Sequence, residues 1–189
     1  MRALVVGDFM FDIYEPSLCR GLEQAGAEVH RLPVAWLFGQ PTSLPRRVQT
    51  KLVVGPSPEL ANLALLRACA RVRPDVVLAW RTPWLRASVI AIARRLGARS
   101  VVLHNNDDPF GPDRDRRIWR RYRRLVPHAD ACFAYRAVNV EEYRAAGARD
   151  VRMLRSWFDP AVHRPMELSS TERERFETSS LRGVAAGWC

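Results

Sequence analysis

The residues best suited to chemistry lie together in one short polar stretch. It consists of His104, Asn105, Asn106, Asp107 and Asp108. A histidine and two carboxylates can exchange protons with a substrate, accept hydrogen bonds from hydroxyl groups or hold a divalent cation. Adjacent carboxylates also raise each other's pKa when both are buried. An Asx-rich turn that caps the following helix would explain the same residues without any chemistry.

This stretch follows a segment, residues 100–104, with the composition of a buried parallel strand. Open α/β sheets bind ligands at the carboxyl ends of their strands. Gly7 and Asp8 occupy the same position after an earlier apolar run, and glycine lets the backbone turn tightly and approach a ligand. A plain tight turn is the alternative there, since neither the dinucleotide fingerprint nor the P-loop pattern is present. We expect both loops at one edge of the sheet.

Six apolar runs alternate with helix-like segments along the chain. The runs are residues 3–6, 28–32, 75–80, 100–104, 131–135 and 151–154. Such alternation implies right-handed crossovers and a parallel sheet covered on both faces. The sequence therefore predicts an α/β fold, a Rossmann-like three-layer sandwich with a mostly parallel sheet of about six strands.

Capping residues give the helix boundaries. Ser57 with Pro58 has the pattern of an N-cap and first turn, and Asn139 with Glu142 has the spacing of a capping box. A further helix is expected over residues 84–96. Glycine ends three of the helices in this interpretation, at Gly26, Gly97 and Gly147. Residues 33–45 are expected to be irregular, and Trp36, Trp80 and Trp84 are assigned to the core.

Composition limits the class of protein. The 189 residues suffice for one well-packed domain, and a hydrophobic content of 48% excludes a disordered chain. No apolar run is long enough for a membrane span, and Asp8 and Asp12 interrupt the only candidate for a signal peptide. The four cysteines have neither zinc nor disulfide-framework spacing. We expect a cytoplasmic protein with no cofactor and no bound metal.

The formal charge of +10 comes almost entirely from arginine. Residues 113–126 hold seven arginines, interspersed with Ile118, Trp119, Tyr122 and Leu125 at helical spacing. A surface helix packed on the sheet is the favoured interpretation, and an anionic membrane surface or phosphate is the alternative partner. The aromatic-interleaved basic strands of RNA-binding modules are missing, so no specific nucleic acid is expected.

Several motifs match one family together. They are Val-Val-Gly-Asp at 5–8, Arg-Pro-Asp-Val-Val at 73–77, Asn-Asp-Asp-Pro-Phe at 106–110, Tyr135 and Arg136 with Asn139, Tyr143 and Gly147, and Phe-Asp-Pro at 158–160 with His-Arg-Pro at 163–165. In these residues the chain resembles the N-terminal domain of the CgeB/YkvP-like (spore protein-like) GT-B glycosyltransferases. The string at 106–110 and the ending Asp-Pro-x-x-His-x-Pro are the most specific parts.

The resemblance implies an acceptor-binding domain of an enzyme that transfers a sugar from a nucleoside-diphosphate sugar to an acceptor hydroxyl. His104, Asp107 and Asp108 would orient or deprotonate the acceptor as catalytic residues. The substrate-binding residues would be Gly7, Asp8, Asn105, Asn106, Arg136 and Asn139. The partners would be an acceptor sugar or glycosylated molecule, and the donor only where a C-terminal domain is present.

Residues 1–165 are predicted to form this acceptor-side domain, and residues 166–189 an irregular tail. The C-terminal donor-binding domain of GT-B enzymes is missing from the sequence, so the chain is expected to be truncated and inactive alone. Two alternatives remain open. One is a non-catalytic module that binds a sugar or nucleotide in the same cleft, and the other is a basic surface protein that binds polyanions through residues 114–124.

Overall fold

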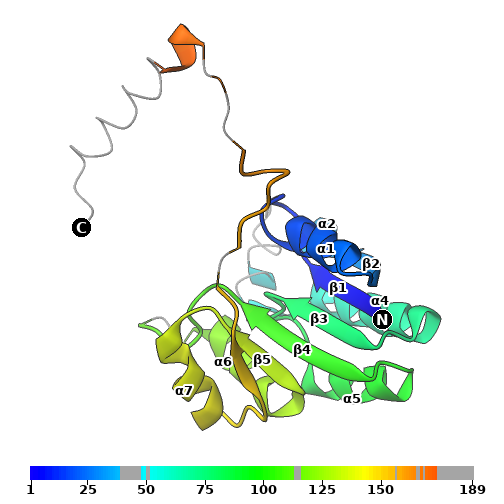
Figure 1. Cartoon of the computed structure of the whole chain (residues 1–189). Helices are drawn as coiled ribbons and strands as arrows, with labels where there is room; N and C mark the ends of the chain where they lie inside the picture. The colour runs from blue at the N-terminus through cyan, green and yellow to red at the C-terminus, as the bar shows by residue number, and fades with distance from the viewer. Residues whose placement is uncertain are drawn as a thin grey trace. The chain divides into compact units, whose positions relative to one another are not determined.

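A computed structural model describes residues 1–38, 48–49, 52–112, 116–155, 157–164, 167 and 169–173 (Figure 1). The chain divides into two compact units, Met1–Trp157 and Phe158–Cys189. The first unit contains the sheet and every residue of the predicted site. Most of the predicted tail, residues 166–189, lies outside the described residues.

The sheet has six strands, and all are parallel. The strand order is β2-β1-β3-β4-β5-β6. The strands are β1 (Arg2–Gly7), β2 (Glu28–Pro33), β3 (Val76–Trp80), β4 (Ser100–Asn105), β5 (Ala131–Ala134) and β6 (Val151–Met153). Each of the six predicted runs is a strand, and the predicted fold class is confirmed.

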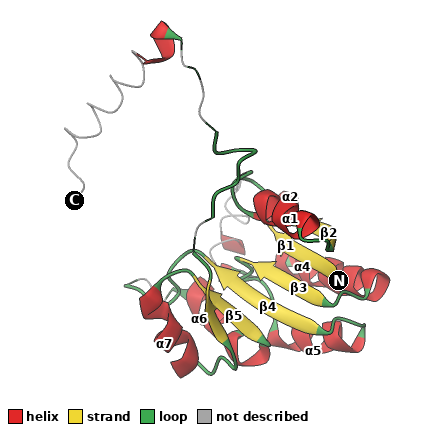
Figure 2. Ribbon diagram, viewed as in Figure 1, coloured by secondary structure: helices red, strands yellow, loops and turns green. Residues whose placement is uncertain are grey.

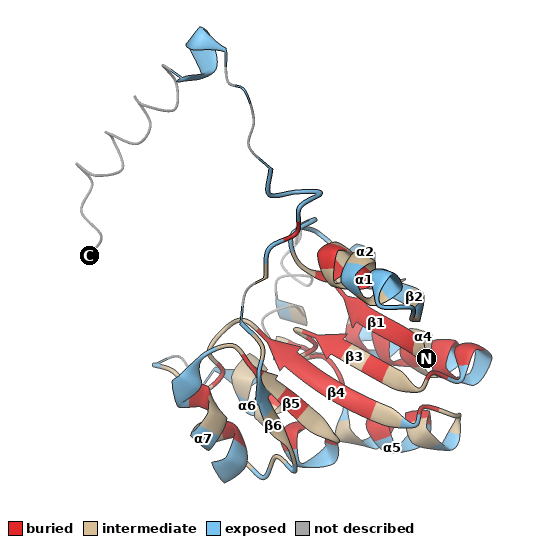
Figure 3. Cartoon of the chain, viewed as in Figure 1, coloured by how far each residue is buried: buried red, intermediate tan, exposed pale blue. Residues whose placement is uncertain are grey.

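Helices connect the strands and cover the sheet (Figure 2). They are α1 (Glu15–Gln24), α2 (Ala35–Phe38), α4 (Pro56–Val72), α5 (Ala87–Arg95), α6 (Arg117–Arg123), the 3-10 helix η1 (Val126–His128) and α7 (Ala137–Ala145). Strand residues such as Leu4, Val77 and Leu103 form the main core with Leu65 of α4 and Ile90 of α5. The central strands β1 and β4 are buried along most of their length (Figure 3). Their burial fixes the strand ends that carry the site.

The three predicted stop glycines all adopt positive φ angles just after a helix: Gly26 at 82°, Gly97 at 112° and Gly147 at 90°. The predicted helix starts were less accurate. The N-cap of α4 is Gly55, not Ser57, because Pro56 needs no N–H partner at the first helical position. The N-cap of α7 is Arg136.

Three further expectations need correction. Helix α5 begins at Ala87 rather than at residue 84, because Leu85 closes a turn with the carbonyl of Thr82. Trp80 and Trp84 are buried as expected, but Trp36 is 72% exposed, and its indole N–H donates to the carbonyl of Pro33 at 3.2 Å. Residues 33–38 complete β2 and form α2 instead of an irregular segment, and residues 39–47 lie outside the described part.

Candidate functional site

The site lies at the carboxyl edge of the sheet, where the strand order reverses. The chain leaves β1 toward β2 on one side and leaves β3 toward β4 on the other. Loops that diverge in this way leave a crevice between neighbouring strands, which is where doubly wound sheets bind ligands. Asp8 follows β1, Arg81 follows β3, and Asp107 lies two residues after β4. The parallel sheet thus brings the Gly7–Asp8 and Asp107 loops to one edge, as the sequence predicted.

A pocket of about 180 Å³ opens between these loops. Its polar groups are the carboxylates of Asp8 and Asp107 and the guanidinium of Arg81. Its apolar wall is formed by Phe38, Val53, Pro83, Trp84, Ile118 and Trp119. Arg81 Nη2 lies 2.9 Å from Asp107 Oδ2, and both side chains are 39% exposed. The pocket therefore combines hydrogen-bonding groups on one side with aromatic surface on the other.

Asp8 differs electrostatically from an ordinary surface carboxylate. Burial raises its pKa, and the positive charge of Arg81 opposes that rise. Directly beneath it, Glu15 Oε1 accepts the backbone N–H of Asp8 at 2.9 Å. Burial also raises the pKa of Glu15, although hydrogen bonds from backbone N–H groups, including those of Asp8 and Phe9, act to lower it. Asp8 is consequently the carboxyl group of the pocket whose proton affinity is shifted toward that of a general base.

The backbone at both sides of the crevice is strained. Phe9 and Arg81 are non-glycine residues with φ angles of 56° and 47°, in the left-handed region. The conformation at Arg81 is held by its N–H, which donates to the carbonyl of His104 at 2.9 Å. Such outliers persist only where surrounding structure imposes them, and they concentrate at ligand sites. Here they direct the chain into the two loops that flank the pocket.

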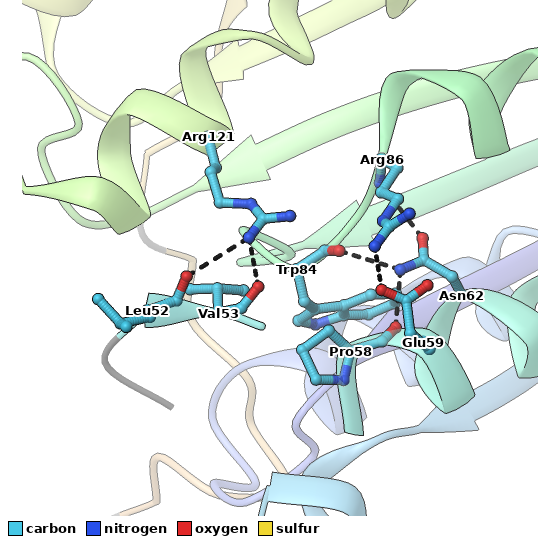
Figure 4. Close-up of polar contacts among 8 residues, drawn as sticks. All are labelled: Leu52, Val53, Pro58, Glu59, Asn62, Trp84, Arg86 and Arg121. Carbon is cyan, nitrogen blue, oxygen red and sulfur yellow. Dashed lines mark hydrogen bonds and ion pairs between the residues drawn. The ribbon is translucent and has the colours of Figure 1, made fainter. Parts of the chain in front are cut away.

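Trp84, part of the apolar wall, is fixed by the buried side chain of Asn62 (Figure 4). The Asn62 amide donates to the carbonyls of Pro58 at 2.7 Å and Trp84 at 3.0 Å. Its oxygen accepts the backbone N–H of Arg86 at 3.2 Å. Asn62 thereby ties the start of α4 to the turn before α5, so the aromatic wall is preorganised.

His104 lies outside the described lining of the pocket. It is 4% exposed, its ring centroid is 4.2 Å from that of Trp80, and its Nδ1 lies 3.2 Å from the carbonyl oxygen of Phe133. Burial lowers its pKa to about 4, so the imidazole is neutral at physiological pH. The structure places it as a support beneath the loop of Arg81 rather than beside Asp107.

The other predicted site residues build the loop after β4. Asp108 Oδ1 accepts the N–H of Phe110 and the amide of Asn139, both at 3.0 Å. Arg136 donates to the carbonyl of Asn106 at 3.2 Å. Asn105 Oδ1 accepts the N–H of Asp107 at 3.1 Å. For Asp108 this is the Asx turn that the sequence offered as the alternative, and its partner Asn139 sits within α7 rather than capping it.

Buried polar atoms remain unpaired at the carboxyl ends of β3 and β4. Among the described residues, the buried side-chain atoms without a hydrogen-bond partner are Trp80 Nε1, Thr82 Oγ1, Asn105 Nδ2 and Asn106 Oδ1. Thr82 follows Arg81 after β3, and the two asparagines end β4 and begin its loop. Unpaired buried polar groups are rare in proteins and mark places where water or a ligand completes the structure. All four atoms belong to residues at or just after the carboxyl ends of β3 and β4.

Of the residues that line the pocket, the sequence predicted only Asp8 and Asp107; among those it missed are Arg81, Trp84 and Trp119, as well as Glu15 beneath Asp8. Arg81 could have been found, because it directly follows the predicted strand 75–80. Glu15 and Trp119 had no comparable signal, since their positions depend on how α1 and α6 pack. Trp84 was assigned to the core, where it does lie at 3% exposure while also lining the pocket.

Within the described segments, no group of three or more His, Cys, Asp or Glu side chains is arranged to hold a metal ion. No helix in this part of the chain is long and apolar enough to cross a membrane. No protein-family model matches the chain, and a search of curated proteins finds no significant match. The function must therefore be argued from the pocket itself.

Proposed function

We propose that the pocket binds one sugar residue and presents its hydroxyl group for glycosyl transfer, as the acceptor side of a GT-B glycosyltransferase. The observation that carries the proposal is the pairing of Asp8, Arg81 and Asp107 opposite Trp84 and Trp119. Carboxylates and guanidinium groups hydrogen-bond to hydroxyls, and aromatic surface packs against the apolar face of a sugar ring. A volume of about 180 Å³ lies below the range of drug-sized ligands and suits one ring.

In the proposed reaction the residues of the pocket have different roles. The Arg81–Asp107 pair orients the acceptor, and Asp8 takes the proton of the attacking hydroxyl. The acceptor oxygen then bonds to the anomeric carbon of the donor, while the bond from that carbon to the phosphate oxygen breaks. The nucleoside diphosphate leaves with the electron pair. Resemblance to GT-B enzymes assigns donor binding to a separate C-terminal domain, so this chain contributes positioning and proton acceptance.

The proposal is tested by sugar binding to the 189-residue chain. The probes are methyl glycosides of glucose, galactose and N-acetylglucosamine, followed by saturation-transfer NMR and calorimetry. We expect saturable binding of at least one probe. Replacing Asp107→Asn removes charge-assisted hydrogen bonds and should weaken binding by about tenfold.

Asp150→Asn is the matched control. Asp150 forms a surface ion pair with Arg152 at 2.8 Å and is 42% exposed, close to the exposure of Asp107, but it lies before β6 at the opposite edge of the sheet. It should leave sugar binding unchanged. Equal effects of the two substitutions, or no binding of any methyl glycoside, would refute the assignment of this pocket.

A further inference from the structure

A second concave surface lies on α6 and is lined by arginine. Its described lining residues are Arg117, Arg120, Arg121 and Arg124, around a hollow of about 330 Å³. Positions three, four and seven apart share one face of a helix, so the four guanidinium groups are gathered by the helix repeat itself. The opposite face of α6 supplies Tyr122 to the core. We call these four residues the arginine hollow.

The charge of the arginine hollow is not neutralised within the described residues. Arg117, Arg120 and Arg124 are exposed, and none has a hydrogen-bond or ion-pair partner in the described part of the chain. The carboxylate that acts on Arg121, that of Glu59, is already bound to Arg86 (Figure 4). Several positive charges therefore face one small volume, and the described residues supply no fixed counter-charge.

Arg121 forms the fixed floor of this volume. It is partly buried and donates to the carbonyls of Leu52 and Val53 (Figure 4). Burial and the neighbouring guanidinium groups of Arg117 and Arg86 lower its pKa. A bound anion would offset the repulsion among these guanidinium groups.

We propose that the arginine hollow is a binding site for a small anion that carries a diphosphate or longer phosphate chain. Guanidinium groups present planar pairs of N–H donors that match phosphate oxygens, and several of them together suit an anion of more than one charge. The volume lies at the lower end of small-molecule sites. No aromatic side chain is among the described lining residues, so these residues do not offer the stacking used to bind single-stranded nucleic acid.

This inference does not depend on the proposed function. The arginine hollow and the sugar pocket share no lining residue, although Val53, which lines the pocket, accepts a hydrogen bond from Arg121. If no sugar binds to the pocket, the proposal of a phosphate site is unaffected. If no diphosphate binds to the arginine hollow, the proposal of a sugar site is unaffected.

The test is calorimetric titration of the full chain with inorganic diphosphate, in 20 mM and 150 mM salt. We expect saturable binding that weakens with salt but persists, and that exceeds the binding of monophosphate. Arg120→Gln combined with Arg124→Gln should weaken the affinity by about tenfold or more. Both side chains are exposed, so the variant should fold normally.

The control variant is Arg67→Gln combined with Arg71→Gln. These arginines are also exposed and four residues apart, on α4, and have no partner in the described structure. The control should bind diphosphate as the parent chain does. If both double variants lose affinity equally, binding reflects net charge and the proposal is wrong, as it is if diphosphate does not bind.

Two further experiments distinguish a small phosphate ligand from a membrane surface and from a nucleic acid. The chain is mixed with phosphatidylcholine vesicles containing phosphatidylglycerol, and separately with a single-stranded oligonucleotide. If saturating diphosphate displaces the vesicles or the oligonucleotide, and the Arg120/Arg124 variant no longer binds them, both ligands use the one phosphate site. Vesicle or oligonucleotide binding that diphosphate cannot displace would instead identify a membrane or nucleic-acid surface and overturn the proposal.

Discussion

The pocket of Asp8, Arg81 and Asp107 and the arginine hollow assemble charge in opposite ways. In the pocket, strand ends that are distant in sequence bring together Asp8, Arg81 and Asp107, with an ion pair of 2.9 Å between the last two. In the hollow, one helix face presents four like charges from neighbouring positions. The pocket is therefore coupled to the core, whereas the hollow is formed mostly by exposed side chains. Substitutions at the two sites should differ accordingly.

The largest expected effect concerns His104, which supports the loop of Arg81. Its pKa of about 4 in the folded chain lies below the value near 6.5 of the unfolded chain. Between these values the unfolded state binds more protons, so the free energy of unfolding falls as the pH is lowered from 6.5 to 4. The loss should be on the order of 3 kcal/mol. Urea unfolding at several pH values measures it.

His104→Gln removes the titrating group and should flatten this part of the pH profile. The comparison is the difference in slope between the parent and the variant, because other titrating groups contribute equally to both. An unchanged slope would show that His104 is not held neutral in the core.

Gly7→Ala should have the next largest effect. A Cβ atom at Gly7 would lie 2.8 Å from Glu15 Cγ and 3.0 Å from Glu15 Cδ, so the buried carboxylate beneath Asp8 must move. We expect a loss of about 1–3 kcal/mol of stability, together with weaker sugar binding. Gly21→Ala is the control, because nothing lies within 4 Å of its Cβ position in the middle of α1. It should be stabilising by about 0.5–1 kcal/mol, and equal effects would contradict the packing described for Gly7.

The salt dependence of ligand affinity should differ between the pocket and the arginine hollow. Sugars are uncharged, so their binding to the pocket should change less than about twofold between 20 mM and 150 mM salt. Diphosphate binding to the exposed arginines should weaken several-fold, as screening predicts. Calorimetry with both probes on the same sample makes the comparison. A steep salt dependence of sugar binding would mean that the probe is not in the pocket.

The smallest effect is expected for the stability of the Arg120→Gln, Arg124→Gln variant. Like charges four apart on a helix repel each other, so removing them should raise the free energy of unfolding by about 0.2–0.5 kcal/mol. Urea unfolding without added phosphate is the measurement. A loss of more than 1 kcal/mol would show that these arginines hold the fold together.

The sequence predicted the sheet well because each strand is a short apolar run, and it placed Asp8 and Asp107 correctly because parallel strands end at one edge. It could not show which face of the sheet a residue occupies. His104 was grouped with Asp107 by proximity in sequence, yet its ring packs against Trp80. Asp108 binds Asn139, which is 31 residues away, and such a contact depends on how α7 packs.

The central claim is that the pocket of Asp8, Arg81 and Asp107 receives a sugar ring against Trp84 and Trp119. It is tested most directly by ¹⁵N NMR of the tryptophan indole groups during titration with the bound methyl glycoside, the Trp119 signal being assigned from Trp119→Phe. The account predicts that the Trp119 signal shifts saturably, while that of exposed Trp36 does not. A shift confined to tryptophans other than Trp84 and Trp119, or no shift at a saturating concentration of sugar, would contradict it.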